Sequence, residues 1–181
     1  MSKFRSFEGT IRNIASLSTD ALPEGERLYR TLQEAARGGS FVKFLCLRRS
    51  PDLKCANLLC TKVGEPCICR LGVVLQKLVS VKALSLSEND LTEIPSSLWE
   101  LHQLHFLDLS RNLLVDIPGD IGKLQNLQQL DVSGNPLQRP LPTQLLELPH
   151  LVRLRVDTAA ARRLPFGRSA WEDAGRVLEI C

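Results

Sequence analysis

A pattern of apolar residues recurs along the middle of this chain with a spacing of 23 or 24 residues. Units begin at Val81, Leu104, Leu127 and Leu151, and each carries apolar side chains at its positions 1, 4 and 6. The first three units also carry an asparagine at position 9, namely Asn89, Asn112 and Asn135. A unit this short cannot bury its apolar face alone, so repeated units must stack to form one continuous core.

Each unit has a physical interpretation. The alternation of apolar and polar residues over positions 1 to 6 predicts a short β-strand whose leucines point to one side. The asparagine predicts a turn, and its amide can form hydrogen bonds with backbone groups of neighbouring units. Loss of such a buried hydrogen-bond partner would cost about 1–3 kcal/mol of stability. A proline after an apolar residue, as in Ile94-Pro95 and Ile117-Pro118, begins the return path. Stacked units therefore predict parallel strands about 4.8 Å apart over a leucine core.

With three copies in register, the segment 81–165 resembles the leucine-rich repeats of the intracellular type, whose 23-residue units read IPxxLxxLxxL. Scribble-like scaffolds and the plant Ras-group repeat proteins share this unit. The resemblance implies an α/β solenoid, built as a short leucine-rich repeat arc. Parallel β-strands would line its concave face, and helical caps would close its N- and C-terminal ends. It implies no particular function, because one fold serves many functions.

The flanks of the repeats are expected to complete the solenoid. Residues 1–57 are interpreted as an N-terminal segment and cap, with a helix over Glu24–Arg37 and a strand over Phe41–Leu47. Counting back 23 residues from Val81 places a degenerate repeat, without the asparagine, at 58–80.

The C-terminal residues 166–181 are expected to form a capping helix. Ser169 to Glu172 has the spacing of a capping box. The helix would place an apolar face on the last coil, made of Trp171, Ala174, Val177 and Leu178.

Charge and cysteine content exclude several classes of protein. The net charge of +3 is segregated, because residues 41–80 carry seven basic and two acidic residues while 81–150 carry four and nine. The basic residues are dispersed and no nucleic-acid-binding motif accompanies them, so we predict no nucleic-acid partner.

No apolar run is long enough to span a bilayer, so no membrane insertion is predicted. The cysteines Cys55, Cys60, Cys67 and Cys69 are predicted to be reduced thiols, because the sequence shows no export signal. They lack paired C-x2-C spacing, so we predict no metal and no cofactor.

The N-terminus has no apolar secretory region, and we therefore predict a cytoplasmic location. A minor alternative is organelle import, because Lys3, Arg5 and Arg12 accompany Phe4, Phe7, Ile11 and Ile14 at helical spacing. Catalysis is not expected either. Asp108 and Asp131 would lie about 5 Å apart on adjacent strands, as in a retaining glycosidase, but an open strand surface excludes no water.

The concave positions provide the candidate binding residues. Positions 2, 3, 5, 7 and 8 of each unit face away from the core in this register. Phe106 is expected to be an exposed aromatic anchor, and Asp108 and Asp131 form an acidic column that ends at Arg155. The partner-binding set is Lys82, Ser85, Glu88, His105, Phe106, Asp108, Arg111, Gln129, Asp131, Arg153 and Arg155.

The sequence thus predicts a non-catalytic protein–protein interaction module, an adaptor or scaffold that is monomeric and binds another protein. Two alternatives stay open. The stretch Ala21–Leu32 resembles the start of an F-box, which would make the chain a substrate receptor of a ubiquitin ligase. The second alternative is that the chain is a fragment of a larger leucine-rich repeat receptor or kinase.

Overall fold

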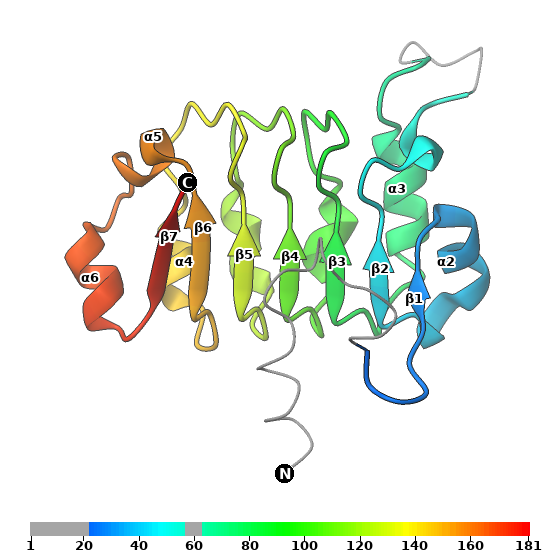
Figure 1. Ribbon diagram of the computed structural model, residues 1–181, viewed down its shortest axis with the longest axis horizontal. Helices are drawn as coiled ribbons and strands as arrows, with labels where there is room; N and C mark the ends of the chain where they lie inside the picture. The colour runs from blue at the N-terminus through cyan, green and yellow to red at the C-terminus, as the bar shows by residue number, and fades with distance from the viewer. Residues whose placement is uncertain (1–21, 57–62) are drawn as a thin grey trace.

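The computed structural model describes residues 22–56 and 63–181, which form one arc-shaped solenoid. Seven parallel strands lie side by side in chain order, and Figure 1 shows them as a continuous row. They are β1 (Leu28–Tyr29), β2 (Phe44–Cys46), β3 (Ala83–Ser85), β4 (Phe106–Asp108), β5 (Gln129–Asp131), β6 (Arg153–Val156) and β7 (Val177–Ile180). The predicted α/β solenoid with parallel strands along one face is confirmed.

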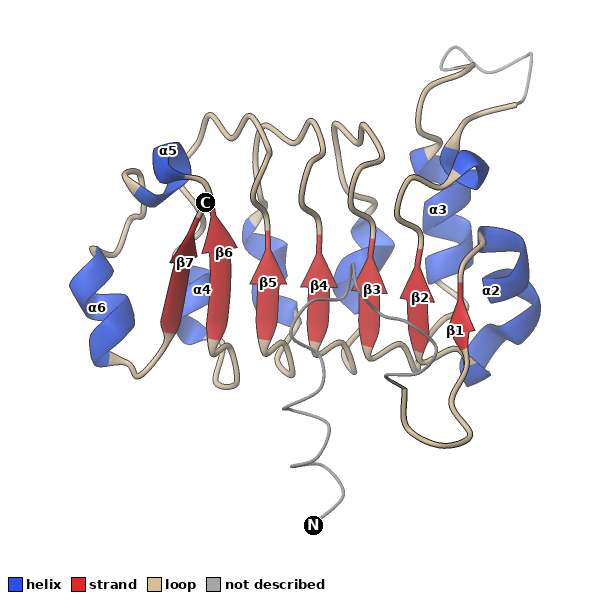
Figure 2. Cartoon of the chain, viewed as in Figure 1, coloured by secondary structure: helices blue, strands red, loops and turns tan. Residues whose placement is uncertain are grey.

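The return segments carry short helices, and Figure 2 shows α3 and α4 behind the sheet. The α-helices in residues 22–56 and 63–181 are α2 (Leu32–Gly38), α3 (Ile68–Leu75), α4 (Gln144–Glu147), α5 (Thr158–Ala161) and α6 (Arg168–Asp173). The others are the 3-10 turns η3 (Gly39–Phe41), η4 (Pro51–Leu53), η5 (Ser96–Glu100) and η6 (Gly119–Lys123). None of the helices in the described part of the chain is long and apolar enough to cross a membrane.

The core follows the repeat register. Leu84 of β3 pairs with Leu107 of β4, which pairs with Leu130 of β5 and then with Leu154 of β6. These leucines are buried in one cluster together with the apolar residues of the return segments, such as Leu98, Ile121 and Leu145. The strand side of the core was therefore predicted from the repeat unit.

The asparagines form a ladder inside the turns. The Asn112 amide nitrogen donates to the carbonyls of Leu86 and Leu109, at 3.0 and 2.9 Å. Its amide oxygen accepts from the backbone nitrogens of Asn89 and Leu91, at 3.0 and 3.1 Å. Asn89 and Asn135 are also buried and bond the backbone in the same way, so each asparagine joins one coil to the previous one.

The N-terminal part differs from the prediction in two ways. The helix expected over Glu24–Arg37 begins only at Leu32, where the Thr31 hydroxyl caps it, because Leu28 and Tyr29 instead form β1. The pairing of β1 with β2 gives hydrogen-bond partners to backbone groups at this edge of the sheet, which would stay unpaired if residues 28 and 29 were helical. The coil expected to begin at Leu58 supplies no strand between its neighbours, since β2 pairs directly with β3. Leu58 itself lies outside the described residues, whereas α3 follows as the return helix between β2 and β3 along the chain.

The C-terminal part also differs. The expected capping helix exists only as α6, and the predicted capping box is absent because Gly167, with no side-chain hydrogen bond, precedes the helix. Gly175 has a φ of 71°, a left-handed conformation that reverses the chain after α6. The residues that follow then form β7 on β6, so Val177 and Leu178 belong to a strand and not to a helix face.

Candidate protein-interaction site

The concave face carries two rows of side chains that run across the sheet. The position-3 row comprises Leu28, Phe44, Ala83, Phe106, Gln129, Arg153 and Val177. The position-5 row comprises Cys46, Ser85, Asp108, Asp131, Arg155 and Glu179. The position-3 row is apolar over β1 to β4, and charged side chains occur in both rows on β6. The concave face therefore has an apolar half and a polar half.

The apolar half is buried. Leu28, Phe44, Cys46, Ala83 and Phe106 form a small cluster of their own, and Leu22 packs against it. Phe106 is only 2% exposed, so the prediction that it is an exposed anchor was wrong. The physical reason is the strand register, which places Phe44 and Phe106 on either side of the small Ala83, so that the two aromatic rings join one apolar cluster.

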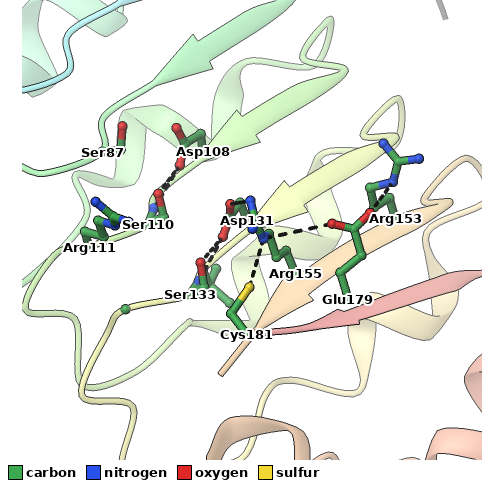
Figure 3. A network of polar contacts seen from close by, with 12 residues as sticks. Ser87, Asp108, Ser110, Arg111, Asp131, Ser133, Arg153, Arg155, Glu179 and Cys181 are labelled. Carbon is green, nitrogen blue, oxygen red and sulfur yellow. Dashed lines mark hydrogen bonds and ion pairs between the residues drawn. The ribbon is translucent and has the colours of Figure 1, made fainter. Parts of the chain in front are cut away.

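The next part of the position-5 row is a ladder of serine and aspartate side chains (Figure 3). The Ser85 hydroxyl donates to Asp108 Oδ2 at 2.9 Å, and the Ser110 hydroxyl donates to Asp108 Oδ1 at 2.7 Å. Ser133 makes the same bond to Asp131 Oδ1 one strand further along, at 2.6 Å. Asp108 is buried, and both its carboxylate oxygens are bonded within the protein. It therefore organises the row, whereas half-buried Asp131 still faces the hollow at the ends of the strands.

The polar half ends in a charged network on β6 and β7. Arg155 contacts Asp131 at 3.6 Å, and its Nε donates to the Cys181 Sγ at 2.9 Å. Arg153 and Glu179 form an ion pair at 3.0 Å, and all these charged side chains stay partly exposed. Figure 3 shows Arg153, Arg155 and Glu179 side by side. The predicted column from Asp108 through Asp131 to Arg155 is thus present in the structure.

Burial raises the pKa of Asp131, although its hydrogen bonds from Ser133 and the charge of Arg155 act in the opposite direction. The ionised form is therefore disfavoured in the folded chain, and protonation of Asp131 adds stability. This contribution is fully present below the unfolded-state pKa and is lost as the pH rises through the folded-state pKa.

We therefore expect Asp131→Asn, which cannot ionise, to gain stability relative to the native chain as the pH rises from about 4 to 7. Urea unfolding of both proteins across this range would measure the difference. Asp116→Asn, which replaces a half-exposed carboxylate in another ion pair, is the control. A stability difference that stays constant, or that shrinks as the pH rises, would contradict this explanation.

A cluster of arginines surrounds Glu88 at the carboxyl ends of β2 to β4. Arg48 donates to Glu88 Oε1 at 2.6 Å, Arg49 contacts Glu88 Oε2, and Arg111 contacts Oε1 at 3.3 Å. The hydrogen bond from Arg48, together with the charges of all three arginines, lowers the pKa of Glu88. Arg48, Glu88 and Arg111 line one end of a hollow of about 330 Å³, whose other end is lined by Asp131 and Arg155. We name Arg48, Arg49 and Arg111 the arginine corner.

The remaining predicted site residues lie at the other end of the strands. Lys82 and His105 occupy position 2, just before β3 and β4, and both are half-buried. Burial lowers the pKa of His105, whose Nδ1 is 2.6 Å from the Gln103 carbonyl oxygen. Gln129 lies in the position-3 row, next to Arg153. Arg48 and Arg49 were not predicted from the sequence, because both precede the recognisable repeats. Leu45 pairs with Leu84 and therefore corresponds to position 4 of a unit, which makes Arg49 position 8.

Comparison with known proteins identifies the repeats. The family model of the leucine-rich repeat region matches residues 67–169. Among solved structures, a leucine-rich repeat protein of Leptospira interrogans matches with a TM-score of 0.55 and 24% sequence identity. The match covers 86% of this chain but only 40% of the other, so this chain spans less than half of that protein's length. No curated protein matches the sequence. The family model spans more than half of the chain, which therefore belongs to the leucine-rich repeat family.

Proposed function

We propose that this chain is a non-catalytic protein-interaction module, an adaptor or scaffold that binds a partner protein through the polar half of its concave face. The observation that carries the proposal is the network of Asp131, Arg153, Arg155 and Glu179, whose side chains are partly exposed yet held by mutual contacts. Side chains already fixed before binding lose less conformational entropy when a partner docks. Polar groups of this kind give an interface its specificity.

The size of the face limits how the partner binds. Seven strands about 4.8 Å apart and five residues high give roughly 570 Å² for the whole concave face, and the polar half offers only part of this area. A standard interface buries about 800 Å² on each partner. A stable complex therefore also involves the loops at the carboxyl ends of the strands, where the arginine corner lies. The F-box-like stretch has no observation in its favour, because its Leu28 and Tyr29 form β1 of the solenoid itself. A cytoplasmic location stays a prediction from the sequence.

The proposal predicts that neutralising two arginines abolishes partner binding. Arg153→Gln combined with Arg155→Gln removes the positive charges of the polar half while keeping side chains of similar shape. We expect partner capture from a native cell extract to fall at least tenfold, a change that corresponds to about 1.4 kcal/mol. The melting temperature should change little, because partly exposed ion pairs contribute only about 0–1 kcal/mol.

The matched control is Lys123→Gln with Arg139→Gln, which breaks three exposed ion pairs outside the concave rows. Quantitative mass spectrometry of the captured proteins would compare both variants with the native chain. Partners lost with the first variant and kept with the control support the proposal. Equal capture by all three proteins would show that this face does not bind them.

A further inference from the structure

The arginine corner contains two residues in a left-handed backbone conformation, at a position of the turn where the next coil carries glycine. Arg49 and Arg111 have φ angles of 49° and 53°, and Glu88 between them has 58°. All three lie in the left-handed region, which is strained for residues other than glycine. They occupy the same position of successive coils, four residues beyond Leu45, Leu84 and Leu107.

The next coil shows what the turn alone needs. Gly134 occupies the equivalent position, with a φ of 68°, and adopts it without strain. The turn can therefore be built without a side chain at this position. Strained residues that persist where glycine would fit are a sign that the side chains have a function.

The charges at this position do not balance locally. Arg48, Arg49 and Arg111 all contact the one carboxylate of Glu88. The other two acidic side chains that line the hollow are engaged elsewhere: Asp131 contacts Arg155, and Asp157 accepts a hydrogen bond from the Gly134 nitrogen at 2.8 Å. Three guanidinium groups thus converge on one anion, and two of them, those of Arg48 and Arg111, line the hollow.

The arginines still have donors to offer. The side chains of Arg49 and Arg111 are 73% and 70% exposed, whereas that of Glu88 is 11% exposed. A guanidinium group has five N–H donors, and within the described residues Glu88 is the only ion-pair partner of these two arginines. Guanidinium groups bind carboxylate and phosphate oxygens in a paired geometry. Glu88 shows that an anionic group fits between them.

We propose that the arginine corner docks an acidic segment of the partner protein, with a carboxylate or phosphoryl group of that segment bound between Arg49 and Arg111. Glu88 is then the internal group that keeps the two guanidinium groups together and competes with the incoming anion. This inference rests on the proposed function, because it assigns the chemistry of the partner at one end of the same face.

The test uses the full chain and two fluorescent peptides in an anisotropy titration at low salt. One peptide is rich in glutamate and carries one phosphoserine, and the other replaces each acidic residue by glutamine or serine. We expect only the acidic peptide to bind, with an affinity that falls as salt is added. Removing the phosphate from the acidic peptide distinguishes the two sources of the anion: a loss of binding assigns the corner to phosphoryl groups, and retained binding to carboxylates.

Two variants make the test specific. Arg49→Gly with Arg111→Gly should lower the affinity at least tenfold while leaving the melting temperature equal or higher, because glycine relieves the backbone strain. Glu88→Gln should raise the affinity, which a merely structural role of Glu88 would not do. Arg139→Gln, at an exposed arginine outside the hollow, should bind like the native chain.

Three results would overturn the inference: no binding of the acidic peptide, equal binding by the double glycine variant, or equal competition by a single-stranded oligonucleotide. The proposed function would survive any of them as long as Arg153→Gln with Arg155→Gln still removes partners from the extract.

Discussion

Asn112→Ala is expected to lower the free energy of unfolding by about 3 kcal/mol, since a buried polar group left without its partner costs about 1–3 kcal/mol. Its amide bonds five backbone groups, which are the carbonyls of Leu86, Leu109 and Ser110 and the nitrogens of Asn89 and Leu91. Alanine leaves the nitrogens of Asn89 and Leu91 without this partner inside the turns, whereas the carbonyls of Leu86 and Leu109 keep bonds from the amides of Asn89 and Asn135. For a chain of this size the change corresponds to a fall in melting temperature of about 10 °C.

The matched control is Asn126→Ala. Asn126 makes one exposed hydrogen bond, to the carbonyl of His102 at 2.7 Å, so its loss should cost less than about 0.5 kcal/mol. Urea unfolding monitored by circular dichroism gives both values. If Asn112→Ala costs no more than Asn126→Ala, the asparagine ladder does not hold the coils together.

Trp171→Ala should destabilise the chain by about 4 kcal/mol, within the range for truncating a fully buried aromatic side chain. Trp171 of α6 has no exposed surface, and its ring stacks on Phe166 at 5.4 Å. The guanidinium group of Arg176 lies over the same ring at 5.0 Å and donates to the carbonyls of Leu145, Leu146 and Leu148. These contacts tie the C-terminal cap to the return segment of the preceding coil.

Loss of the indole should therefore loosen β6 and β7 before the rest of the sheet. Hydrogen exchange is the measurement, because it reports the local opening of each segment. The amides of β6 and β7 should exchange much faster in the variant, and those of β3 and β4 should change less. Trp171→Phe keeps a ring on Phe166 and should show a smaller effect. Uniformly faster exchange along the whole sheet would instead indicate that the cap does not open separately.

The repeat register could be predicted because its signal is periodic. Leu84, Leu107, Leu130 and Leu154 lie in neighbouring strands as expected, since stacking identical units leaves only one arrangement that buries them all. The edges of the sheet carry no such signal. β1 has two residues and β7 has four, and pairing with the adjacent strand stabilises them more than any local preference does.

The candidate site was predicted only in part, for a related reason. Glu88, Asp131 and Arg155 were placed correctly on the concave face, because they lie inside the repeats. The exposure of Phe106 was wrong, since it depends on Phe44, a residue of another strand outside the repeats. The arginine corner was missed because Arg49 joins it only through the pairing of β2 with β3, across a connection of irregular length.

The central claim is that the polar half of the concave face meets the partner, and site-specific photo-crosslinking tests it most directly. A photoreactive amino acid would replace Gln129, the neighbour of Arg153 in the position-3 row, in one version of the chain and Asp120, exposed in the return segment η6, in another. In the native cell, position 129 is predicted to crosslink to a protein that position 120 does not reach. Crosslinks from position 120 alone, or the same crosslinked proteins from both positions, would contradict the claim.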